Sequence, residues 1–113
     1  MSTVSRLLLF TQPDDIDRVT AALAAITGTA PTTMRITRLD GARVTAHLVE
    51  VTGTVIEVAP GEPAVPALLE LRVPDLAAVS DRLTAAGMVI TPERGGARVQ
   101  IGALTVSVRQ EER

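Results

Sequence analysis

The sequence predicts an α+β domain built from two copies of a strand–helix–three-strand unit. Three observations predict this fold class. In each half of the chain an amphipathic helical pattern follows a short apolar strand, runs rich in β-branched residues follow the helix, and a proline-rich segment separates the two halves. At 113 residues the chain has the length of one domain, which spans 1–113. The copies cover about 45 to 55 residues each, as expected of an internal repeat.

The first unit is expected over residues 5–59 and opens on the apolar run Arg6–Phe10. The segment TQPDD ends this run with residues typical of a helix start, and apolar residues then recur at helical spacing from Asp15 to a stop at Gly28. Turn signals LDG and TG separate the β-rich runs that follow. These runs predict an antiparallel meander of strands over 32–38, 42–51 and 54–59.

The second unit, over residues 67–110, repeats this order after a connector at 60–66. The connector sequence PGEPAVP holds three prolines, which continue neither a sheet nor a helix. A strand is expected over 67–73, followed by a helix with Asp75 as its N-cap and Gly87 as its C-terminal stop. Strands are then expected in the segments MVITP, ARVQI and LTVSV.

Composition excludes several classes of function. The chain has no cysteine and a single histidine, His47, and all 11 basic residues are arginine. Thiolate, lysine Schiff-base and multi-histidine metal chemistry within one chain are therefore excluded. A net charge of −2 and one aromatic residue give no surface for nucleic acid. No apolar run is long enough for a membrane span, and no signal peptide is evident, so we expect no membrane partner and a soluble, cytoplasmic protein.

The run LLELRVPDLAAVSDRLTAAGMVITP resembles the strand–helix opening of a module in the vicinal oxygen chelate superfamily. This superfamily includes glyoxalase I, extradiol dioxygenases and bleomycin-resistance proteins. The duplicated order of elements extends the resemblance over nearly the whole chain. The resemblance implies two βαβββ modules whose curved mixed sheets form a cleft, the glyoxalase/bleomycin-resistance-like fold. It also implies a homodimer.

In metal-using relatives, the resemblance places a divalent ion on side chains of the first and last strand of each module. Counting back from the start of each helix gives Leu68 in the second module and Leu7 or Leu8 in the first. In the last strands, VIEV puts Glu57 on a ligand position and LTVSV puts Ser107 on the other. Of these positions only Glu57 carries a good metal ligand, and one carboxylate does not hold a hard cation. We therefore expect no metal and no cofactor.

Strand alternation assigns further residues to the cleft. If Ile56 and Val58 pack under the helix, Glu57 faces the other side of the sheet. The same rule predicts a ligand-binding set of mixed charge: Glu57, Glu70, Arg72, Ser107 and Arg109. Arginine is a natural partner for a carboxylate or phosphate. The alternative readings are a solvated sheet face and, for Glu70 with Arg72, a structural ion pair.

Three functions compete at this point. The first is a metal-independent protein that binds a small molecule, for example to sequester an antibiotic or metabolite. The second is a glyoxalase-like isomerase, epimerase or lyase in which Glu57 is the general base or a residual metal ligand and His47 donates a proton. The third is a non-catalytic assembly domain with a collapsed cleft.

Overall fold

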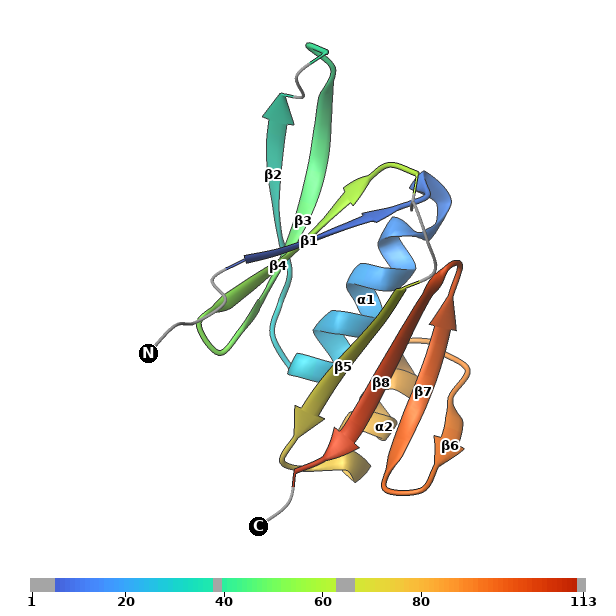
Figure 1. Ribbon diagram of the computed structural model, residues 1–113. Helices are drawn as coiled ribbons and strands as arrows, with labels where there is room; N and C mark the ends of the chain where they lie inside the picture. Colours follow the sequence, from blue (N-terminus) through green and yellow to red (C-terminus); the bar gives the residue numbers. More distant parts are fainter. Residues whose placement is uncertain (1–5, 38–39, 63–66, 112–113) are drawn as a thin grey trace.

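The computed structural model describes residues 6–37, 40–62 and 67–111. Within these ranges it contains two four-stranded sheets, each with one α-helix after its first strand (Figure 1). The first half comprises β1 (Arg6–Thr11), a 3₁₀ turn η1 (Pro13–Asp15), α1 (Ile16–Thr27), β2 (Thr32–Thr37), β3 (Arg43–Val51) and β4 (Thr54–Pro60). The second half comprises β5 (Ala67–Val73), α2 (Leu76–Ala85), β6 (Thr91–Glu93), β7 (Gly96–Ile101) and β8 (Leu104–Gln110).

Both halves have the same topology. The strand orders are β1-β4-β3-β2 and β5-β8-β7-β6, so the first strand of each half lies beside the last. That pair is parallel and the other pairs are antiparallel, which makes both sheets mixed. The predicted βαβββ modules and the meander of β2, β3 and β4 are confirmed.

One local prediction, the strand in MVITP, is wrong for residues 88–90. In the segment MVITP, strand β6 is confined to Thr91–Glu93, because the Met88 amide donates to Leu83 O at 3.0 Å and the side chain of Met88 is buried. Met88 therefore belongs to the segment that terminates α2 and not to a strand. The predicted N-cap Asp75 accepts a hydrogen bond from the Ala78 amide at 3.1 Å, whereas Asp15, at the N-cap position of α1, makes no such side-chain bond.

Parts of three expected segments lie outside the described residues. They are residue 5 at the start of the first module, Arg38 at the end of the second expected strand, and residues 63–66 of the connector.

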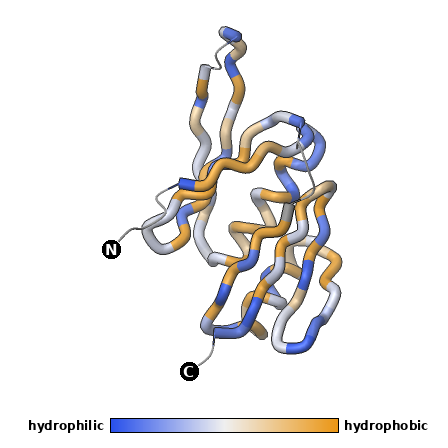
Figure 2. Tube along the Cα trace, in the orientation of Figure 1, coloured by the Kyte–Doolittle hydropathy of each residue, from blue (hydrophilic) through white to orange (hydrophobic). Residues whose placement is uncertain are grey.

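One hydrophobic core spans both modules. The helical spacing turns Val19 and Leu23 of α1 inward, and Val79 and Leu83 of α2 do the same. Alternate residues of the two sheets join this cluster, including Val49, Ile56, Val58, Val99, Val106 and Val108. The helices thus cover one face of each sheet and contact each other, and Figure 2 shows the hydrophobic positions along α1 and the neighbouring strands. The opposite face of each sheet is turned away from the core.

The end of α1 is fixed by a residue of α2. Gly28 closes the helix in the left-handed region at φ 71°, with its amide bonded to Ala24 O. The guanidinium of Arg82 donates through Nε to Ala25 O at 2.6 Å and through Nη2 to Ile26 O at 3.3 Å. This contact links the two modules.

Neither helix in the described ranges is long and apolar enough to cross a bilayer.

Candidate ligand-binding site

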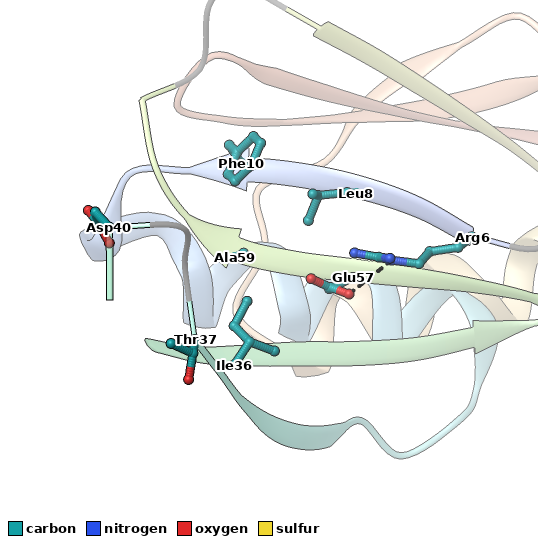
Figure 3. Close-up of a pocket in the computed structure, with 8 residues that line it drawn as sticks. All are labelled: Arg6, Leu8, Phe10, Ile36, Thr37, Asp40, Glu57 and Ala59. Atoms are coloured by element: carbon teal, nitrogen blue, oxygen red, sulfur yellow. Dashed lines mark ion pairs between the residues drawn. The ribbon is translucent and has the colours of Figure 1, made fainter. Parts of the chain in front are cut away.

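Glu57 is a buried carboxylate on the open face of the first sheet. Its neighbours on β4, Ile56 and Val58, point into the core, so alternation turns Glu57 to the other side as predicted. Only 3% of the residue is exposed. The side chains of Arg6 and Glu57 point toward each other, with Nε 3.0 Å from Oε1 (Figure 3). A guanidinium thus compensates the buried negative charge.

A groove of about 630 Å³ lies over this ion pair. Its volume falls in the range of small-molecule sites. Figure 3 shows that β1, β2 and β4 supply most of its walls. The apolar walls are Leu8, Phe10, Ile36 and Ala59, and the polar ones are Arg6, Thr37, Asp40 and Glu57. An adjoining cavity of about 510 Å³ shares Arg6 and Glu57 and extends past Met34, Leu48 and Val55.

Strand register shows which first-strand residues lie beside the two predicted last-strand positions. Leu8 pairs with Glu57, whereas Leu7 pairs with Ile56 and so lies on the helix side of the sheet. In the second module Leu68 pairs with Thr105. The residue beside Ser107 is Glu70.

The second module brings four predicted residues together on its open face. Glu70 Oε1 accepts from Ser107 Oγ at 3.4 Å and forms an ion pair with Arg109 Nε, also at 3.4 Å. Arg72 lies beside Arg109 on the adjacent strand. The ion-pair partner of Glu70 is therefore Arg109 and not Arg72. A cavity of about 650 Å³ opens over Glu70, Arg72 and Arg109 and also reaches Arg94.

His47 lies away from these residues. In the β3–β4 register it pairs with Val58, a core residue, whereas Leu48 pairs with Glu57. His47 therefore shares the helix-facing side of the sheet. The structure does not bring its imidazole to the face that carries Glu57.

Among the described residues, the cavities on the two open faces are separate. The two cavities near Glu57 are lined by residues of the first module alone, and the cavity near Glu70 by residues of the second module alone. The five predicted ligand-binding residues thus divide into Glu57 on one face and Glu70, Arg72, Ser107 and Arg109 on the other.

No protein-family model and no curated protein matches the chain. Solved structures do match it over nearly its whole length. The fosfomycin resistance protein FosX of Listeria monocytogenes aligns at a TM-score of 0.65 and 14% identity, covering 99% of this chain and 93% of FosX. TnmS3, an antibiotic-binding protein of a Streptomyces species, aligns at a TM-score of 0.64 and 15% identity, covering 99% of this chain and 98% of TnmS3. FosX of Mesorhizobium loti aligns at a TM-score of 0.56 and 10% identity, covering 96% of this chain and 90% of that protein. These proteins are members of the vicinal oxygen chelate superfamily. The chain has the vicinal oxygen chelate fold.

The donor set does not fit the divalent ion that this fold carries in metal-using proteins. The four positions defined by register hold Leu8, Glu57, Glu70 and Ser107, with the two carboxylates on different faces. Arg6 already occupies one side of Glu57. Among residues 6–37, 40–62 and 67–111, no group of three or more His, Cys, Asp or Glu side chains could hold a metal ion.

The sequence analysis did not predict two arginines that line these cavities, Arg6 in the first module and Arg94 in the second. Arg6, Leu8 and Phe10 lie on the same face of β1, because they are two residues apart. The period-2 rule applied to RLLLF would therefore have identified Arg6. Arg94 lies in the turn between β6 and β7, where no periodicity predicts the direction of a side chain.

Proposed function

We propose that the protein binds a small organic molecule without a metal ion, as in the sequestration of an antibiotic or metabolite. The observation that carries this proposal is the groove over Glu57, which combines apolar walls with the ion pair between the buried Glu57 carboxylate and the exposed Arg6 guanidinium. Sites of this size and mixture are typical of small-molecule binding. TnmS3, which shares the fold, is described as an antibiotic-binding protein, and FosX as a fosfomycin resistance protein.

Metal independence is part of this proposal. Its support is that Arg6 lies against Glu57, where its positive charge takes the role that a cation would otherwise have. Leu8, the neighbour of Glu57 on β1, offers no lone pair to a metal. The ligand would therefore be held by aliphatic contacts, the ring of Phe10 and hydrogen bonds to the charged groups.

We further propose that the protein is a homodimer in which each open face is closed by a second copy. β1 and β5 are edge strands, paired only with β4 and β8 among the described strands. Their open-face residues Leu8, Phe10 and Leu68 are 37%, 48% and 59% exposed. Apolar edge strands left uncovered favour association with another chain. Closure of this kind would unite Glu57 with the second-module face of the other copy.

The oligomeric state tests the dimer directly. Light scattering on the wild-type protein should give twice the chain mass, and Leu68→Lys should shift the molecules toward the monomer. Val89→Lys is a matched control, because Val89 is exposed but lies outside the cavities described above. A monomeric wild type, or equal effects of both substitutions, would contradict the proposal.

A ligand screen by thermal unfolding tests the binding function. Planar antibiotics and small organic acids are suitable compounds, and a ligand at about 100 times its Kd stabilises the folded state by about 2.7 kcal/mol. We expect at least one compound to raise the Tm, and Phe10→Ser to reduce that rise while Val89→Ser leaves it unchanged. Absence of any stabilisation at millimolar concentration would count against the proposal.

The two alternatives have less support. An enzyme using Glu57 as its base would have to release the carboxylate from Arg6, and His47 is on the other side of the sheet. Any turnover found in the screen should be lost in Glu57→Gln if this alternative holds. A purely structural role predicts a filled interior around the ion pair, whereas a groove of about 630 Å³ lies there.

A further inference from the structure

We propose that the open face of the second module binds a tetrahedral oxyanion, a phosphate or phosphonate group, through Arg72, Arg94 and Arg109. This inference rests on the proposed ligand-binding role of the protein and specifies which group of the ligand this face recognises. The three arginines line a single cavity of about 650 Å³. Two glutamates, Glu70 and Glu111, line it as well, so the described lining residues carry three positive and two negative charges, a net charge of +1.

The side chain of Arg109 is already oriented for binding. Its Nε faces Glu70 Oε1 at 3.4 Å, and its Nη1 donates to Arg94 O at 2.8 Å. Ser107 holds the same carboxylate oxygen of Glu70 at 3.4 Å. A guanidinium has five N–H donors, so three remain for a ligand after these two contacts. Fixing the side chain in advance lowers the entropy lost when an anion binds.

Within the described ranges, Arg72 and Arg94 have no ion-pair partner. Both residues are exposed, and neither guanidinium has a hydrogen bond or ion pair with another residue in the part of the chain that the structure describes. Arg72 also lies directly beside Arg109 in the β5–β8 register. Like charges at facing positions of adjacent strands destabilise a sheet. An anion between them would offset this repulsion.

The chemistry of the donors favours a tetrahedral anion. Arginine binds oxyanions through paired N–H groups, and three guanidinium groups around one cavity offer partners to three oxygens of the same group. A carboxylate has two oxygens and would leave one arginine without a partner. The repulsion between Glu70 and a bound anion is reduced, because the Glu70 carboxylate already contacts Arg109 and Ser107.

NMR titration of the full chain tests the inference. The probes are inorganic phosphate, methylphosphonate, acetate and the neutral ester dimethyl methylphosphonate, added at a constant ionic strength of about 0.1 M. We expect phosphate and methylphosphonate to give saturable shifts of the Gly95 amide, which lies in the cavity, and of the arginine Nε–H signals. Acetate should bind more weakly, and the neutral ester should not bind.

Substitutions locate the effect. Arg94→Gln and Arg72→Gln should each weaken binding about tenfold, the loss typical of one charge-assisted contact, without loss of the folded spectrum. Arg18→Gln is the matched control, since Arg18 is an exposed arginine on α1 away from the cavity, and its binding should equal that of the wild type. Unchanged binding in both cavity variants would overturn the inference. Equal binding of acetate would overturn the preference for a tetrahedral group.

The test separates this inference from the proposed function. If neither phosphate nor methylphosphonate binds while a compound from the thermal screen does, the oxyanion site is refuted and the proposed function stands. If the oxyanions bind as expected and no organic compound stabilises the protein, the oxyanion site stands and the proposed function fails.

Discussion

The carboxylate of Glu57 depends on Arg6. Glu57 is 3% exposed, and Arg6 is its only ion-pair or hydrogen-bond partner in the described part of the chain. The side chain of Arg6 is 59% exposed, so solvent screens part of the attraction. The larger effect is desolvation, because a buried carboxylate that loses its partner stays buried without compensation.

This asymmetry predicts the order of three variants. Arg6→Met should lower the free energy of unfolding by about 1–3 kcal/mol, because it leaves the Glu57 charge unpaired. Glu57→Gln should cost less, since a neutral amide needs no cation. The double variant should be more stable than Arg6→Met alone. Urea unfolding measures all three, with Arg18→Met as the control. Equal losses for Arg6→Met with and without Glu57→Gln would show that the pair is not coupled.

The buried hydroxyl of Thr20 predicts a substitution that raises, and does not lower, the free energy of unfolding. Thr20 lies on the inner side of α1 at 5% exposure, and its Oγ1 has no hydrogen-bond partner among the described residues. Thr20→Val should therefore raise the free energy of unfolding by about 1 kcal/mol. Thr27 is the matched control on the same helix, because its Oγ1 bonds to Leu23 O at 2.8 Å. Thr27→Val should not stabilise, and a stabilising effect of both would contradict this explanation.

At the scale of elements, α1 relies on α2 for its C-terminal end. Two carbonyls of its last turn, of Ala25 and Ile26, accept from Arg82, whose positive charge also suits the negative end of the helix dipole. Arg82→Ala should lower the free energy of unfolding by about 1–2 kcal/mol and speed hydrogen exchange at the end of α1. Arg82→Lys should restore part of the loss. Arg18→Ala, on the exposed side of α1, should change neither quantity.

Sequence patterns located most elements because each pattern is local. The apolar spacing of α1 and the alternation in β4, β5 and β8 are properties of consecutive residues, and the structure confirms them. The expected strand at MVITP shows the limit. Its β-branched residues suit a strand, but Met88 packs into the core and bonds to the end of α2. A tertiary contact here overrides the local preference.

At the scale of the whole molecule, the shared core predicts cooperative unfolding. Residues of both helices and both sheets form a single cluster, so neither module buries its apolar face alone. Methyl signals of Val58 in the first module and Val108 in the second should therefore be lost at the same urea concentration, measured at fixed protein concentration. Separate midpoints would show that the modules fold independently.

The sequence by itself determined the order of elements, the duplication and the face on which each strand residue lies. Periodicity encodes these features, since it fixes whether a side chain points toward the core or away from it. Glu57, Glu70, Arg72 and Arg109 line cavities on the open faces, the side to which alternation assigns them. Only the tertiary structure decided that Arg6 neutralises Glu57 and that Arg94 joins Arg72 and Arg109. It also decided that the described residues of the two charged faces line separate cavities. These features depend on strand register and on turns that bring distant segments together. A local sequence pattern determines neither the register nor the direction of such turns.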